Sequence, residues 1–228
     1  MFESLARRPL YLDVADRVRE LIYRRQLNPG DWIDEPALCE QLAISRTPLR
    51  EALKVLHGEQ LVELVPRKGC RVNELDDEGL LELFPVMASL EGLCANLATQ
   101  KLTPKDLKRL EGIHERLEAT AAGGKVDDYY EANREFHRAI QELADNRWLN
   151  RIAGELRNVL LLARHRQLTH PGRLQASLEE HRAIMQALRD GEAEQAGKAM
   201  HLHLCKQEKV LRKQARESEG MTDENTAA

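Results

Sequence analysis

Three histidines in the second half of the chain could together bind one metal ion. His137, His181 and His203 each fall on an apolar stripe with helical spacing, so each is expected to face the interior of the fold. Asn133 precedes His137 by one helical turn and shares its face, so these two side chains can chelate together. Three imidazoles that converge in a core suit Zn²⁺, Ni²⁺ or a similar divalent metal. The spacing therefore predicts a metal site that includes these four side chains.

The same pattern has a second interpretation. A histidine on an apolar stripe is commonly a core residue whose ring is hydrogen-bonded. Three such residues at similar levels along neighbouring helices are harder to explain in this way, because each buried imidazole costs free energy unless it is paired. His181 lies about nine residues before the turn at 190–191 and His203 about twelve after it, so antiparallel helices bring them to similar levels. On the pattern alone, both interpretations stay open.

The elements that position these histidines are helices. Six helical periodicities and no convincing strand follow residue 80. We therefore predict an all-α bundle of about six helices for residues 79–215, which makes the whole chain mainly α. Residues 73–78 form a short polar linker before the bundle, and the polar segment 216–228 is predicted to be a disordered tail.

A second group of residues, near the N-terminus, suits contact with double-stranded DNA. A predicted helix begins near Ser45 and presents Arg46 and Arg50 on one outward face, with Thr47 in its first turn. The first turn of such a helix enters the major groove, where Arg donates two hydrogen bonds to guanine and hydroxyls bond phosphates or base edges. The alternative is an amphipathic helix with a solvated basic face.

The segments around this helix complete a winged helix-turn-helix over residues 1–72. Two helices, at about 10–26 and 35–42, precede it, and the first is stopped by Asn28-Pro29-Gly30. Strands at 61–65 and 70–72 follow it and are joined by a basic turn. The turn offers positive charge and close backbone approach to a phosphate chain through Arg67, Lys68 and Gly69.

Composition agrees with this organisation. A chain of 228 residues predicts two domains, and a net charge of −4 excludes a generally basic protein. Between residues 44 and 72, however, six Lys and Arg accompany three Asp and Glu, so positive charge gathers where DNA would lie. The four cysteines form no CxxC pair, which favours a reducing cytoplasm. No apolar run approaches the roughly 18 residues of a membrane helix. We therefore expect a cytoplasmic protein without a membrane partner.

Residues 10–72 resemble the DNA-binding domain of GntR-family bacterial transcription regulators. The resemblance rests on the PG, SRTPLREAL and P-x-[KR]-G elements. It implies that Lys68-Gly69 approaches the minor groove and that the operator is contacted by Ser45, Arg46, Thr47 and Arg50. Pro36 stands where family members often carry Arg, so one usual DNA contact is expected to be absent.

The second half resembles the ligand-sensing FCD domain of the FadR-type branch. The segments LEGLCANLA, NREFHRAI and SLEEHRAIMQALRDGEAEQAGKAMHLHL carry this resemblance. Many such domains bind a metal through an Asp and three His, in the pattern D-x3-H, then EH, then HL. The implied ligands are His137, His181 and His203, since His203 rather than His201 fits the A-M-x-x-H-L frame, and Asn133 takes the Asp position. A neutral Asn leaves the charge of the ion less compensated, which weakens metal binding but attracts an anion such as an organic acid.

A further departure concerns the contact with that anion. Met87 stands where many members carry an Arg that helps to hold carboxylates. Arg157 and Arg164 could substitute for it, although arginines at this spacing can equally be solvated or ion-paired.

The resemblance implies a homodimer that binds near-palindromic operator DNA. The expected function is that of a ligand-responsive regulator rather than an enzyme, in the usual case a repressor released by a small anionic metabolite. Two alternatives stay open. The helical domain could bind its effector without metal, or the histidines could serve a metal-dependent hydrolase. Against the hydrolase, the inward stripes show no Glu or Asp as a general base, and neither HExxH nor GxSxG occurs.

Overall fold

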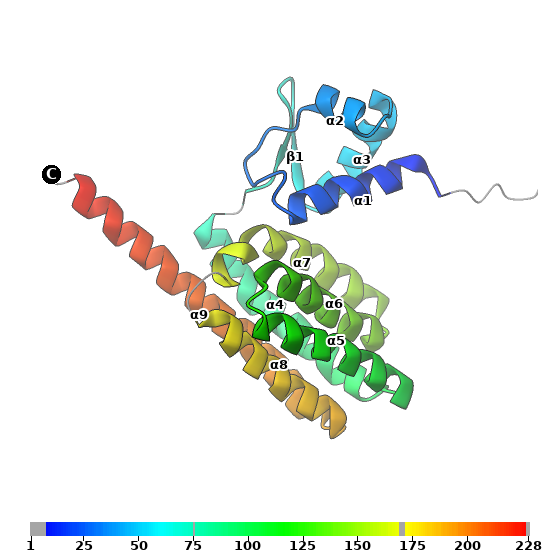
Figure 1. Cartoon of the computed structure of the whole chain (residues 1–228), viewed down its shortest axis with the longest axis vertical. Coiled ribbons are helices and arrows are strands. Elements are labelled where there is room, and N and C mark those ends of the chain that lie inside the picture. The colour runs from blue at the N-terminus through cyan, green and yellow to red at the C-terminus, as the bar shows by residue number, and fades with distance from the viewer. Residues whose placement is uncertain (1–7, 75, 169–171, 227–228) are drawn as a thin grey trace, which may run out of the picture. The chain divides into compact units, whose positions relative to one another are not determined.

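The structure, a computed structural model, describes the backbone of residues 8–74, 76–168 and 172–226, and their side chains except at 77, 161–168 and 214–226. Contacts within the chain divide it into two compact units, Met1–Leu75 and Asp76–Ala228. Figure 1 labels the helices of each unit and strand β1.

The N-terminal unit contains three helices and a two-stranded antiparallel sheet. The helices are α1 (Leu10–Tyr23), α2 (Glu35–Gln41) and α3 (Arg46–Gly58), and the strands are β1 (Val62–Val65) and β2 (Gly69–Val72). The strands pair in the register Val62↔Val72 to Val65↔Gly69. Its core joins α1 to α3, which pack together through buried residues such as Val18 and Leu53. This is the winged helix-turn-helix that the sequence predicts.

Local chemistry sets the ends of these elements. Helix α1 ends at Tyr23, three residues before the predicted Gln26, because Arg25 adopts a left-handed φ of 58° and the chain folds back on the last turn. Asp34 caps α2, since its Oδ1 accepts a hydrogen bond from the Ala37 amide at 3.0 Å. Gly69, with a φ of 117°, allows the turn between β1 and β2 to close.

The C-terminal unit is a bundle of helices over the part of the chain that the structure describes. These are α4 (Asp77–Thr99), α5 (Pro104–Ala122), α6 (Val126–Ala144), α7 (Arg147–Leu168), α8 (Arg173–Arg189) and α9 (Ala193–Thr226). Helix α4 packs against α6, α7 and α9, while α8 packs against α5 and α9. The α4–α9 contact is close because Gly92 meets Gly197, where a Cβ on either residue would lie 3.0 Å or less from a backbone oxygen of the other.

Two boundaries differ from the sequence prediction. Helix α4 already begins at Asp77, inside the predicted linker 73–78. Helix α9 continues to Thr226, whereas the sequence predicts a disordered tail from residue 216. The segment KQARESE consists mainly of strong helix formers, so the helix propagates outward from the packed part of α9. Figure 1 shows this end of α9 extending beyond the other helices of the bundle.

One described helix is long and apolar enough to cross a membrane by length and composition, namely Glu78–Thr99, with a mean hydropathy of 1.4. This corrects the expectation that no apolar stretch approaches such a length. Because α4 packs against three other helices of the bundle, it is apolar around much of its circumference. A helix in the core of a bundle can therefore be as long and as apolar as a membrane-spanning helix.

Candidate metal centre and nucleic-acid interface

Three buried histidines from three helices meet in the bundle. His137 on α6 is 1 % exposed, and His181 on α8 and His203 on α9 are fully buried. Their ring centroids lie 4.6 to 5.3 Å apart. One nitrogen of each ring lies within 4.8 Å of one nitrogen of the other two. The structure thus brings together the three side chains that periodicity places on separate inward faces.

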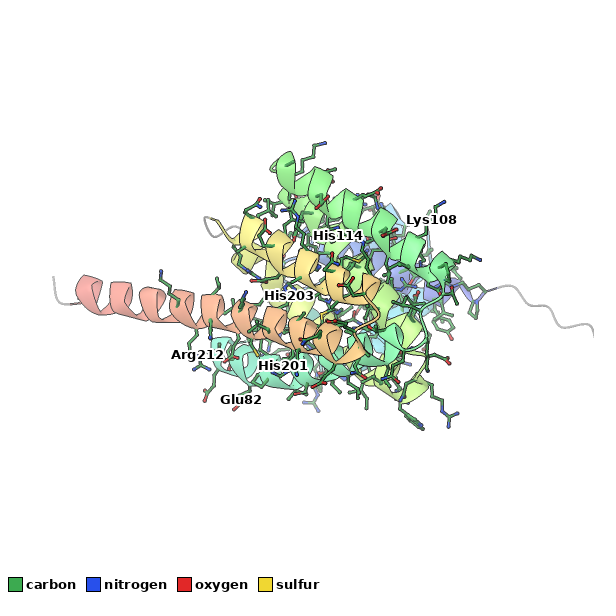
Figure 2. The ribbon with its side chains drawn as sticks, turned by 90° about the horizontal axis from the view of Figure 1, so that it is seen from below. Glu82, Lys108, His114, His201, His203 and Arg212 are labelled. Carbon is green, nitrogen blue, oxygen red and sulfur yellow. The ribbon has the colours of Figure 1, made fainter. Side chains whose placement is uncertain are left out.

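The choice between the two neighbouring histidines of α9 follows from their surroundings. His203 contacts Glu180 of α8, whereas His201 is exposed and its Cβ lies beside Gly92 of α4. Figure 2 labels both residues on α9. Only His203 therefore belongs to the cluster.

Two of the three rings are oriented by carboxylates. His137 Nδ1 lies 2.5 Å from Oε2 of Glu91, and His203 Nδ1 lies 2.7 Å from Oε2 of Glu180. An ionised carboxylate only accepts hydrogen bonds, so in both rings Nδ1 carries the proton and donates. Nε2 is then the nitrogen that can bind a metal. A carboxylate behind a histidine is the arrangement that fixes the tautomer of metal-binding imidazoles.

Each carboxylate is in turn paired with a buried arginine. Arg157 of α7 forms an ion pair with Glu91, which also accepts a hydrogen bond from Gln141 at 3.3 Å. Arg173 donates two hydrogen bonds to Glu180, at 2.9 and 2.8 Å. All of these side chains are less than a tenth exposed. The two glutamate–arginine pairs are therefore neutral overall and lie inside the bundle.

These pairs correct one statement from the sequence and decide between two alternatives for Arg157. The inward faces do carry acidic residues, Glu91 and Glu180, which the apolar stripes did not reveal. Arg157 is ion-paired rather than solvated, since it is 4 % exposed and pairs with Glu91. The side chain of Arg164 lies outside the described residues. Two features of the sequence could have indicated the buried acidic residues: Glu180 directly precedes His181, and Glu91 directly follows Leu90.

Asn133 is also buried, at 1 % exposed, and lies one turn before His137 on α6. Within the described part of the chain, its Oδ1 makes no hydrogen bond. A buried carbonyl oxygen without a donor costs free energy, which a metal ion or a ligand donor would recover.

These residues fit a divalent ion such as Zn²⁺ or Ni²⁺. The donors are neutral nitrogens, and Asn133 offers a carbonyl oxygen one helical turn from His137, a set that suits borderline metals. The spacing of up to 4.8 Å is wider than the about 3.3 Å that tetrahedral zinc imposes on two ligand nitrogens, so binding requires the rings to draw together. Because no donor is charged and the glutamates are matched by arginines, an ion here would keep its positive charge.

A fourth histidine, His114 of α5, is also buried, at 4 % exposed. Its ring lies 6.3 Å from that of Phe136, and its Nε2 has no hydrogen-bond partner among the described residues. Burial lowers its pKa below the ordinary value of 6.5, because the charged form loses solvation.

The candidate DNA-contacting residues of the recognition helix are all exposed. Ser45, at the N-cap position of α3, makes no side-chain capping hydrogen bond, and Arg46 and Thr47 follow it in the first turn. Arg50 is 65 % exposed, and its Nε lies 3.3 Å from Glu35 of α2. A pair this exposed is weak and can exchange for a phosphate or a base.

The turn of the wing offers the second group. Arg67, Lys68 and Gly69 are exposed between β1 and β2. Arg67 has a left-handed φ of 65°, so the turn holds its backbone in a defined conformation. Arg71 of β2 donates a hydrogen bond to Glu63, its cross-strand neighbour on β1.

Comparisons with known proteins agree with both units. Residues 10–72 match the family model of bacterial regulatory proteins of the gntR family, and residues 82–205 match the FCD domain. The chain is 29% identical over 211 residues to a probable D-xylose utilization operon transcriptional repressor of Paenarthrobacter nicotinovorans, covering 89% of this chain and 91% of that protein. It is 25% identical over 196 residues to the uncharacterized HTH-type transcriptional regulator YdhC of Bacillus subtilis, covering 86% and 88%.

Among solved structures, Escherichia coli McbR/YncC superposes with a TM-score of 0.81 at 24% identity, covering 92% of this chain and 100% of that one. At this identity the likeness establishes the fold. The FCD match alone spans more than half of the chain. The chain therefore belongs to the gntR family of bacterial transcription regulators, with an FCD domain as its C-terminal unit.

Proposed function

We propose that this DNA-binding regulator senses a small anionic metabolite at a divalent metal held by His137, His181 and His203. The observation that carries the proposal is the carboxylate behind two of the rings, which directs both Nε2 atoms away from Glu91 and Glu180. Asn133 supports it with a buried oxygen that makes no hydrogen bond in the described structure. When bound, the metal supplies positive charge and open coordination positions.

Charge makes an anion the expected effector. Arg157 and Arg173 already neutralise the two glutamates, and the histidines and Asn133 contribute no negative charge. A divalent ion among these donors leaves an excess of positive charge in a buried region, which a small carboxylate would compensate. Zn²⁺ and Ni²⁺ are the metals that this donor set suits best.

DNA binding then depends on two copies of the N-terminal unit. A single winged helix contacts few bases, so a homodimer on a near-palindromic operator is expected. In this proposal Ser45, Arg46, Thr47 and Arg50 contact the major groove, and the wing contacts the backbone or the minor groove through Arg67, Lys68 and Gly69. Effector binding shifts the population between arrangements that match the half-site spacing and arrangements that do not, which releases a repressor. A protein that acts in this way works in the cytoplasm.

An exposed apolar stripe on α4 supports the dimer. Val86 and Leu93 are 49 % and 47 % exposed and lie two turns apart, with Leu90 and Leu97 completing the stripe. Large apolar residues in a row on one helix mark an interface more often than a solvated face. A second copy of this chain is the proposed occupant, and sedimentation of Leu93→Glu tests it: a variant that stays dimeric excludes this face.

An effector domain without metal remains the second candidate. The spacing of up to 4.8 Å between the histidine nitrogens favours it, because the rings would then form a polar wall for a ligand. The hydrolase alternative is weaker. Glu91 and Glu180 each hold an arginine and a histidine Nδ1, so both lie behind their rings and are poorly placed to act as a base.

The deciding experiment compares His203→Ala with His201→Ala. Both remove one histidine from α9, but only the first removes a side chain of the cluster. We expect as-purified wild type and His201→Ala to carry near one metal per chain by elemental analysis, and His203→Ala to carry none while still binding operator DNA. If wild type binds neither Zn²⁺ nor Ni²⁺ when these ions are added, the metal proposal is overturned and the metal-free alternative is left.

A further inference from the structure

Gln207 contacts the face of His203 that would hold a metal. It lies one turn after His203 on α9 and is 4 % exposed. Its Nε2 lies 2.6 Å from Nε2 of His203. Because Nδ1 of that ring donates to Glu180, Nε2 carries the lone pair of the neutral imidazole. The Gln207 amide is therefore the donor in this hydrogen bond.

The carboxamide is held at this position through its nitrogen. Its oxygen Oε1 is buried and makes no hydrogen bond within the described part of the chain. A buried polar atom without a partner costs free energy, so the side chain gains from any rearrangement that satisfies the oxygen. The orientation of Gln207 is thus easier to change than that of Glu180, which has partners on both of its oxygens.

His203 Nε2 has a single lone pair, which it can give either to the Gln207 amide or to a metal ion. We infer that Gln207 couples the two binding events of the sensing site: it competes with metal for His203, and once displaced it donates its N–H groups to an anionic ligand. This inference rests on the proposed metal site.

The ligand chemistry follows from what surrounds the released amide. Arg157 and Arg173 balance the two buried glutamates, and Lys206 adds a further positive charge 3.9 Å from Glu180. A displaced amide in this setting would be a buried donor without an acceptor. A small carboxylate can accept its N–H groups and also compensate the excess positive charge. Gln207 thus becomes the residue that distinguishes an anion from a neutral ligand of similar size.

The test is Gln207→Met, which keeps the length of the side chain and removes both amide atoms. Gln141→Met is the matched control, because Gln141 is also a buried amide one turn after a cluster histidine, but it donates to Glu91. Zn²⁺ affinity is measured by chelator competition, and succinate and acetate affinities by calorimetry on Zn²⁺-loaded protein. We expect Gln207→Met to bind Zn²⁺ on the order of tenfold more tightly, because no hydrogen bond to Nε2 of His203 has to be broken, and to bind both carboxylates on the order of tenfold more weakly.

The opposite directions of these two effects identify the coupling. Loss of packing alone would weaken both, and Gln141→Met is expected to leave Zn²⁺ affinity unchanged or lower it. In wild type, the side-chain amide resonances of Gln207 should shift on addition of Zn²⁺ and again on addition of succinate. Wild type that binds no Zn²⁺ overturns the proposed function and this inference with it. Wild type that binds Zn²⁺ and succinate, with both affinities unchanged in Gln207→Met, overturns this inference alone.

Discussion

Glu180 is hydrogen-bonded to His203 of the neighbouring helix, although it directly precedes His181 in the chain. Its Oε2 lies 2.7 Å from Nδ1 of His203. On α8 adjacent residues point about 100° apart, so Glu180 and His181 approach the cluster from different sides. Arg173, two turns earlier on α8, donates two hydrogen bonds to the same carboxylate. One buried glutamate thus fixes both the tautomer of His203 and the position of an arginine.

Breaking this ion pair should destabilise the fold. In Glu180→Gln, Arg173 keeps its charge in a buried position but loses its counter-ion, which we expect to lower the free energy of unfolding by about 3–5 kcal/mol. The double variant Glu180→Gln/Arg173→Met removes both charges and should recover a large part of that loss. Urea titration of wild type, both single variants and the double variant gives the coupling energy. Additive losses would mean that the two groups do not depend on each other.

Asn133→Asp should raise metal affinity. The substitution places a carboxylate where a neutral amide stands one turn from His137, and a negative ligand compensates part of the charge of the ion. We expect Zn²⁺ to bind on the order of tenfold more tightly, which corresponds to about 1.4 kcal/mol from the added negative charge. The same variant should bind succinate more weakly, because less positive charge remains to attract it. Tighter binding of both ligands would contradict the charge argument.

The N-terminal unit and the helical bundle followed from the sequence because each depends on local signals. The winged helix has a capping Asp34, a glycine in its turn and a regular apolar stripe on α3, and all of these act within a few residues. The three histidines could be placed inward for the same reason, since an apolar stripe defines which face of a helix is buried.

The buried glutamates and arginines around the three histidines could not be placed from such local signals. Glu180 and Arg173 lie off the apolar stripe of α8, yet both are buried because α8 packs against α5 as well as α9, which widens its buried arc. Glu91 tolerates burial only because Arg157 and His137 reach it from two other helices. Such partners are far apart in sequence, and periodicity within one helix does not reveal them. His114 is buried for a related reason, since α5 packs against both α6 and α8.

Stability should depend on pH through His114. Burial is the main cause that lowers its pKa in the folded state, with Glu118 opposing and Arg189 adding to the effect. A histidine whose folded pKa lies below its unfolded value of 6.5 binds its proton more readily in the unfolded state. Stability is therefore fully present above that value and is lost as pH falls below it, by at most about 1.4 kcal/mol per pH unit.

The measurement compares the free energy of unfolding at pH 7 and pH 5 for wild type and His114→Leu. The decrease should be smaller in the variant, which also lacks the buried Nε2 that has no partner among the described residues. His201→Leu controls for the loss of any one histidine. Equal decreases in wild type and His114→Leu would show that other groups carry the pH dependence.

Arg50→Ala should separate DNA recognition from effector sensing. Arg50 lies on the exposed face of α3, near its N-terminus, and its contact with Glu35 is long and largely solvated. Loss of a bidentate contact to guanine should weaken specific operator binding by about 1–3 kcal/mol and leave Zn²⁺ binding unchanged. Arg24→Ala removes an exposed, ion-paired arginine that directly follows α1 in the same unit, and it serves as the control for net charge. A mobility-shift titration at fixed salt decides the outcome. If both variants lose affinity for operator DNA and for random DNA equally, Arg50 contributes only general attraction to phosphates and does not recognise a base.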